Sequence, residues 1–151
     1  MAQISKVIFK SEKRETSIKT DEVFNSSEKV VRLAREIYEV EELDVNCFEA
    51  VFCLFFNRQG KAMSYLKVSE GGLSSSIIDV KKIAKAALDV FAHSVVMFHN
   101  HPSGNLKPSK EDIGATEKVK SALNLFDVRL LDHLILTDEE SFSFNDEGII
   151  Y

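Results

Sequence analysis

The chain has 151 residues, of which 44% are hydrophobic, so it can bury a core as one compact domain. Its formal charge of −5 disfavours non-specific binding to a phosphate backbone, which proteins neutralise with Lys and Arg. The longest apolar run, residues 50–56, is far shorter than a bilayer span, and the N-terminus has no apolar signal region. We therefore expect a soluble, cytoplasmic protein with no membrane contact.

The periodicity of apolar residues predicts that strands and helices alternate in the second half of the chain. The expected elements are a strand at 4–10, a helix starting at Asn25 to Glu28, strands at 46–57 and 62–72, a helix from Asp79, a strand at 94–98, a helix after Ser109, a strand at 128–137 and a short strand within 141–151. This alternation favours an α/β layered fold. We take residues 1–151 as a single domain, with a core of about 25–151 and a short N-terminal strand and loop at 1–24.

Two helices carry an apolar stripe at helical spacing. The first stripe consists of Val80, Ile83, Ala84, Ala87, Leu88 and Phe91, and the second of Ile113, Thr116, Val119, Leu123 and Phe126. The cysteines, Cys47 and Cys53, fall in one expected strand, too far apart for a disulfide. Both are interpreted as core thiols.

Residues 98–112, FHNHPSGNLKPSKED, place two histidines at the end of a buried strand. His99 and His101 point to the same side if the strand is regular, because side chains alternate along it. The proline after them ends the strand, and a Pro/Gly loop leads back to Ser109, a suitable helix cap. Asp112 then lies in the first turn of the next helix.

Two neutral imidazoles and one carboxylate suit a zinc ion, one per chain, with His99, His101 and Asp112 as ligands. Three protein ligands leave a fourth position open, which is typical of catalytic zinc. Each residue also has a structural interpretation: a histidine can close a strand, and an acid is favoured in a first helical turn. The combination of all three favours the metal site.

Glu49 is the most unusual acid of the chain, because the strand expected at 46–57 is apolar on both faces. A carboxylate in such a strand is unfavourable unless it is paired or hydrogen-bonded. It can reach solvent at the strand end, or it can act as a general base beside the metal. We favour the base.

These residues resemble the JAMM (MPN+) metalloproteases, which carry a distant Glu and then His-x-His-Pro, Ser and Asp at fixed spacing. In this chain the matching positions are Glu49, His99-Asn100-His101-Pro102, Ser109 and Asp112. The segments HNHPSG and LLDHLIL and the late SF are most similar to the bacterial RadC-type JAB domain, over about residues 25–151.

The resemblance implies a three-layer α/β/α fold with a mixed central sheet, related to cytidine deaminases. It implies zinc held by His99, His101 and Asp112, with Glu49 as the acid/base and Ser109 as an oxyanion-stabilising hydroxyl. In the related proteases, a zinc-activated water attacks an amide or isopeptide carbonyl. The implied substrate is therefore a peptide or protein.

Full-length RadC-type proteins carry an N-terminal helical extension resembling a helix-hairpin-helix DNA-binding region. This chain has only a short segment before the domain, so we expect a stand-alone member, which weakens the DNA-repair role that the RadC name suggests. DNA is a possible partner that the acidic charge does not favour.

Three functions are considered: a zinc hydrolase of JAMM type, a DNA-associated RadC-like factor in DNA repair or mobile-element biology, and a non-catalytic metal-containing binding module. Base deamination is disfavoured, because the deaminase PCxxC signature is absent from the sequence. Asn100 is expected to point away from the histidines and bond loop backbone. Asp132 and His133 form a structural pair or support a zinc ligand.

Overall fold

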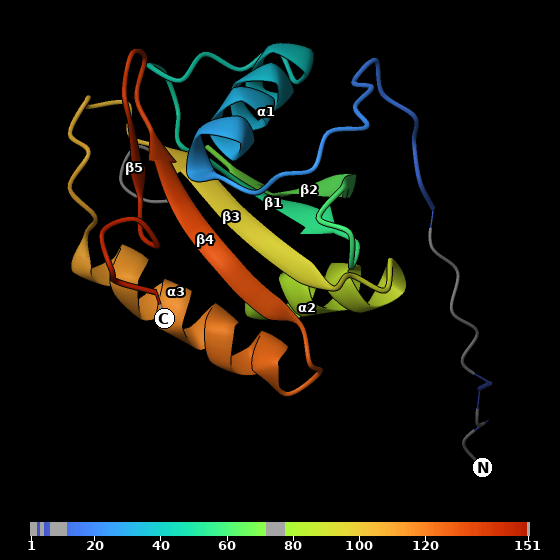
Figure 1. Cartoon of the computed structure of the whole chain (residues 1–151). Coiled ribbons are helices and arrows are strands. Elements are labelled where there is room, and N and C mark those ends of the chain that lie inside the picture. Colours follow the sequence, from blue (N-terminus) through green and yellow to red (C-terminus); the bar gives the residue numbers. More distant parts are fainter. Residues whose placement is uncertain (1–2, 4, 7–11, 72–77, 151) are drawn as a thin grey trace.

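The central feature is a five-stranded mixed sheet with helices on both faces (Figure 1). The computed structural model describes residues 3, 5–6, 12–71 and 78–150. Its elements are α1 (Ser27–Val40), β1 (Ala50–Phe56), β2 (Ala62–Glu70), α2 (Val80–Asp89), β3 (Ser94–Asn100), α3 (Lys110–Asn124), β4 (Arg129–Leu136) and β5 (Ser141–Ser143). Helix α1 covers one face and helices α2 and α3 cover the other, which confirms the expected α/β/α layers.

The strand order is β2-β1-β3-β4-β5. Only β3 and β4 are parallel, and α3 forms the crossover between them; the other neighbours are antiparallel. In the antiparallel pair of β1 and β3, Val51 lies opposite His99. The start of β1 and the end of β3 therefore meet at one end of the sheet, although they are far apart in sequence.

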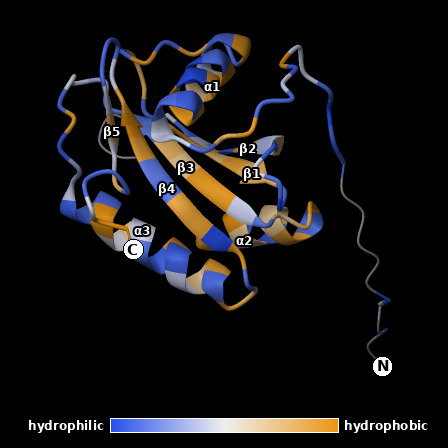
Figure 2. Ribbon diagram, viewed as in Figure 1, coloured by the Kyte–Doolittle hydropathy of each residue, from blue (hydrophilic) through white to orange (hydrophobic). Residues whose placement is uncertain are grey.

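Every residue of β1 is buried, which confirms that this strand is covered on both faces. Its side chains alternate between two apolar clusters, one beneath α1 and one beneath α2 and α3. Under α1, Phe52 stacks on Phe98 of β3 with ring centroids 5.2 Å apart. Apolar residues predominate along the central strands in Figure 2.

The predictions that one helix starts at Asp79 and another after Ser109 are confirmed. Each of these residues caps its helix. Ser26 caps α1 in place of Asn25, so this helix begins slightly later than predicted. The apolar stripes predicted for α2 and α3 extend past the C-terminal ends of these helices. Phe91 and Phe126 follow the ends of α2 and α3 and are 91% and 48% exposed.

The strand expected at 46–57 begins only at Ala50, and residues 46–49 form a loop that leads into it. Cys53 is buried as predicted, but the prediction of a buried Cys47 was wrong, because the loop exposes it. The strand expected at 4–10 lies largely outside the described residues, as does residue 72 of the expected return strand. None of the helices in the described part of the chain has the length and apolarity needed to cross a membrane.

Candidate metal centre

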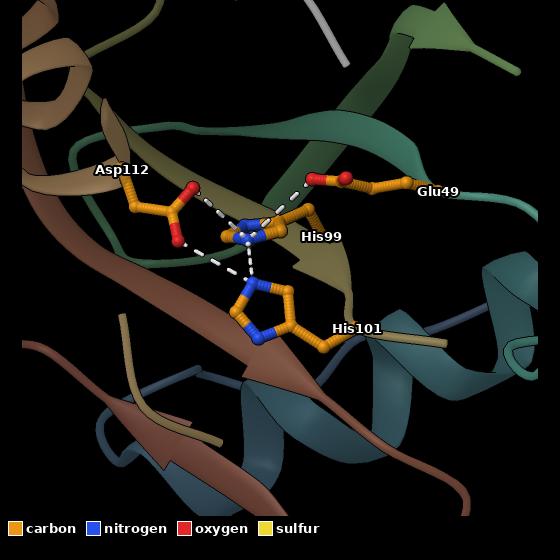
Figure 3. Close-up of side chains that lie close together, drawn as sticks. All are labelled: Glu49, His99, His101 and Asp112. Carbon is orange, nitrogen blue, oxygen red and sulfur yellow. Dashed lines mark hydrogen bonds and ion pairs between the residues drawn. The ribbon is translucent and has the colours of Figure 1, made fainter. Parts of the chain in front are cut away.

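Four chemically active side chains gather at the end of the sheet where β1 starts and β3 stops (Figure 3). They are Glu49, His99, His101 and Asp112, and one ligand atom of each lies within 4.8 Å of those of the others. The site therefore combines three parts of the chain: the approach to β1, the end of β3 and the first turn of α3.

The two histidines point to the same side, as expected for alternate positions along a strand. His101 follows the last residue of β3, but its backbone N–H still donates to the carbonyl of Leu136 at 2.9 Å. This bond continues the pairing with β4 and keeps the chain extended. As a result, the Nε2 atoms of His99 and His101 lie 2.9 Å apart.

Asp112 serves the helix and the site together. Its Oδ2 accepts the backbone N–H of Ser109 at 2.8 Å, while the Ser109 hydroxyl accepts the N–H of Asp112 at 2.9 Å, forming a capping box. The same carboxylate places Oδ1 3.4 Å from Nε2 of His99 and Oδ2 3.3 Å from Nε2 of His101. The helix-acid interpretation and the metal-ligand interpretation are thus compatible.

Glu49 lies just before β1, so it is not in the covered middle of a strand as the sequence suggested. Its side chain is 19% exposed, and its Oε1 lies 3.8 Å from Nε2 of His99. Figure 3 shows the carboxylate directed toward the histidines, on the other side of His99 from Asp112. Glu49 is therefore at the strand end, but it faces the site.

Asn100, between the two histidines, points to the opposite face of the sheet, under α1, and is fully buried. The direction agrees with the prediction, but the loop it binds precedes β1 and does not follow the histidines. Its oxygen accepts from the Ala50 N–H and the Tyr38 hydroxyl, and its amide donates to the carbonyls of Val45 and Phe48, each at 2.8 Å. These bonds fix the loop that carries Glu49.

The hydrogen-bond network assigns the tautomer of His101. Its Nδ1 lies 2.6 Å from the backbone carbonyl of Asn105, which can only accept. Nδ1 therefore carries the proton, and in the neutral ring the Nε2 lone pair faces the centre.

The electrostatics of the site keep the aspartate ionised. Burial by itself would raise the pKa of Asp112, but hydrogen bonds from the rings of His101 and His99 in their protonated forms and from the Ser109 N–H hold it well below the usual range. The hydrogen bond to Asp112 in turn raises the pKa of His101, against the opposing effect of burial. A carboxylate beside two ring nitrogens is the form that can bind a cation.

The donor set and its spacing fit a divalent metal. Tetrahedral zinc with bonds of about 2.0–2.1 Å to nitrogen and oxygen separates its ligands by roughly 3.3 Å. Oδ1 of Asp112 lies 3.4 Å from Nε2 of His99 and Oδ2 lies 3.3 Å from Nε2 of His101, so each carboxylate oxygen is near this separation from one ring. The two Nε2 atoms are slightly closer to each other, at 2.9 Å. Glu49 lies farther out. Imidazole and carboxylate donors suit zinc and several other divalent ions.

A family model described as RadC-like JAB domain matches residues 8–149. The chain belongs to the RadC-like JAB domain family.

Proteins named UPF0758 protein are similar to this domain. That of Flavobacterium johnsoniae is 43% identical over 101 residues, which cover 67% of this chain and 44% of the relative. That of Chlorobaculum parvum is 39% identical over 102 residues, covering 68% and 46%. That of Nitrosococcus oceani is 34% identical over 113 residues, covering 75% and 50%. The chain thus spans about half the length of these relatives.

One residue outside the predicted ligand set of this RadC-like JAB domain, His133, contacts the Nδ1 side of His99. His133 places Nε2 2.7 Å from Nδ1 of His99, which is the supporting contact considered for the Asp132-His133 pair. Asp132 is structural, since it accepts from the Ser143 hydroxyl and the Asn145 N–H.

Thr116 was not predicted as a site residue and was assigned only to an apolar stripe. Its Oγ1 lies 2.6 Å from Nδ1 of His133. Its position one helical turn after Asp112 is a signal that could have found it, because residues four apart share a helix face.

Proposed function

We propose that this RadC-like JAB domain is a zinc-dependent hydrolase of JAMM type that cleaves peptide or isopeptide amide bonds, with one zinc per chain. The observation that supports this most strongly is the convergence of two ring nitrogens and two carboxylates within 4.8 Å of one another. When the rings are neutral, these groups present lone pairs to one point. A cation at that point stabilises an arrangement that is otherwise repulsive.

His99, His101 and Asp112 would hold the ion, since their ligand atoms have the spacing described above. Two neutral imidazoles and one carboxylate leave a divalent ion with a net charge of about +1. When bound, the ion supplies Lewis acidity, which polarises a carbonyl and lowers the pKa of water.

Glu49 is proposed as the general base and acid. Its carboxylate is 3.8 Å from Nε2 of His99, and its loop is fixed by Asn100, so it lies beside the three ligands and is held in place. From there it can take a proton from an attacking water and return it to the leaving amine. Its side chain is 19% exposed, so solvent reaches it.

Ser109 is proposed to stabilise the developing oxyanion. Its hydroxyl oxygen accepts the Asp112 N–H, and this leaves the hydroxyl hydrogen able to donate. The capping box fixes the serine against the ligand aspartate. A donor held in this way stabilises charge as it develops, without reorganisation during the reaction.

The test is a metal-dependence screen with isopeptide, linear peptide and nucleic-acid substrates, comparing wild type with Glu49→Gln. We expect about one zinc per chain in both proteins, and hydrolysis of an amide substrate that is slower in Glu49→Gln than in wild type by at least about 100-fold. Glu117→Gln, an exposed acid on α3, is the matched control and should behave as wild type.

Full turnover by Glu49→Gln would overturn the assignment of the base. Cleavage restricted to nucleic acid would replace the proposal with the DNA-associated function. A zinc-loaded protein inactive on the whole panel would favour a non-catalytic binding module.

A further inference from the structure

A buried chain of hydrogen bonds runs behind His99 and returns to Asp112. Nδ1 of His99 lies 2.7 Å from Nε2 of His133, and Nδ1 of His133 lies 2.6 Å from Oγ1 of Thr116. The Thr116 hydroxyl donates to the backbone carbonyl of Asp112 at 2.6 Å. His133 and Thr116 are 0% and 3% exposed, so water does not compete for these bonds.

The hydrogen bond from Thr116 to the Asp112 carbonyl determines which atom is the donor in each of the other bonds. The Asp112 carbonyl can only accept, so it takes the single hydroxyl hydrogen of Thr116. Thr116 must then accept from Nδ1 of His133, and neutral His133 must accept at Nε2 from Nδ1–H of His99. His99 is left with a bare Nε2, which is the atom that faces His101, Asp112 and Glu49.

The surroundings of His133 favour its neutral form. Its two ring nitrogens contact an imidazole and a hydroxyl, and neither group carries a charge that would stabilise a buried cation. The ring also stacks on Phe144, with centroids 4.7 Å apart and planes at 25°. This stacking restrains the plane of the ring and therefore the line of both hydrogen bonds.

We propose that His133 is a positioning residue for the metal centre and that Thr116 orients it. Together they hold His99 in the tautomer and rotation that direct the Nε2 lone pair at the ion. The chain of hydrogen bonds starts at the proposed ligand His99 and ends on the backbone of the proposed ligand Asp112. It therefore also connects β3, β4 and α3 around the site. This inference rests on the proposed metal site, but it concerns residues outside the ligand set.

The first experiment measures metal affinity by competition with a chromophoric chelator, together with the absorption spectrum of the cobalt-substituted protein. We expect His133→Phe, which keeps a ring against Phe144 but removes both hydrogen bonds, to weaken affinity about 10- to 100-fold and to alter the cobalt bands. Thr116→Val should weaken affinity in the same direction, and Thr116→Ser should restore it. Ile135→Val, a buried change on the same strand, is the control for lost stability and should leave both readouts unchanged.

The second experiment needs no metal. Nitrogen chemical shifts of the histidine rings in the metal-free protein at alkaline pH should show His99 protonated at Nδ1 in wild type, and a mixture of tautomers in His133→Phe. An Nε2-protonated His99 in wild type would overturn the inference, as would folded variants at positions 133 and 116 that bind metal as tightly as wild type. If wild type binds no metal but shows the Nδ1 tautomer, the proposed function fails while the hydrogen-bond chain stands.

Discussion

The side-chain oxygen of Asn100 accepts the backbone N–H of Ala50 at 2.8 Å, so the residue between the two histidines holds the residue that follows Glu49. Successive side chains of β3 therefore have different roles on the two faces of the sheet. His99 faces the candidate metal centre on the α3 side, whereas Asn100 hydrogen-bonds the loop that carries Glu49 on the α1 side. This explains how a base and its neighbouring ligand keep their relative positions.

Asn100→Asp should be strongly destabilising. The substitution replaces an amide that donates to two buried carbonyls by an oxygen that repels them. We expect a loss of about 3 kcal/mol in the free energy of unfolding, measured by denaturant titration. Asn25→Asp, an exposed position, should change it by less than about 0.5 kcal/mol. An equally stable Asn100→Asp protein would contradict a structural role for these bonds.

Asp112→Asn should separate the two roles of the aspartate. The amide oxygen can still accept the Ser109 N–H, so the helix cap survives, but a neutral amide is a poor ligand for a divalent ion. We expect loss of metal with little change in the stability of the metal-free protein at alkaline pH. Asp112→Ala should lose metal and a further ~1 kcal/mol, because the cap is removed as well. Metal content and thermal unfolding measure the two effects, and retained metal in Asp112→Asn would exclude this residue as a ligand.

Stability should depend on pH in opposite ways with and without metal. In the metal-free protein the pKa of His101 is raised above its ordinary value of 6.5. The folded state therefore binds more protons than the unfolded chain above pH 6.5, and stability falls as pH rises through the folded pKa. His133, whose pKa is lowered by burial, gives a slope of opposite sign only near and below its ordinary value of 6.5, where the unfolded chain is protonated. At alkaline pH it is neutral in both states and does not oppose the trend.

Metal binding reverses that trend, because protons compete with the ion for the same nitrogens. Thermal unfolding between neutral and alkaline pH should show falling stability in chelator and rising stability with zinc. At mildly alkaline pH, His101→Gln should remove the slope seen in chelator. At higher pH, Cys53 and Tyr38, whose pKa burial raises, add a slope of the same sign in both proteins. A slope that is unchanged in this variant would assign the effect to another group.

The parts of the site that the sequence predicted are those set by local geometry. The strand period aligned His99 with His101, and the spacing from Ser109 to Asp112 is that of a capping box. The sequence placed Glu49 within the strand, whereas it lies just before the strand. Its position depends on Asn100, which is distant in sequence. The bonds of Asn100 to the loop at 45–50 hold those residues before the strand, and nothing in the apolar run itself marks where pairing begins.

The helix ends were missed for a different reason. In the described part of the chain, each of the helices α1, α2 and α3 is followed by a left-handed residue, and the N–H of the next residue bonds back into the last turn. Glycine is the usual signal for such a position. Here the left-handed residues are Glu42, Phe91 and Asp127, with φ of 56°, 52° and 58°. With no glycine to mark the stop, the apolar stripes were extended to Phe91 and Phe126.

Phe91→Gly should therefore stabilise the fold. A left-handed conformation costs a residue with a Cβ about 1–2 kcal/mol, and glycine removes this strain. The side chain is 91% exposed, so little packing is lost, although the greater freedom of glycine in the unfolded chain offsets part of the gain. We expect a net increase of about 0.5–1 kcal/mol in the free energy of unfolding.

The matched control for this prediction is Leu125→Gly. Leu125 is 81% exposed and also follows a helix, but its φ of −61° is right-handed, so glycine relieves no strain there. This change should lower the free energy of unfolding by up to about 1 kcal/mol. Denaturant titration of both variants against wild type measures the difference. Two variants destabilised by the same amount would show that the backbone at Phe91 is not strained.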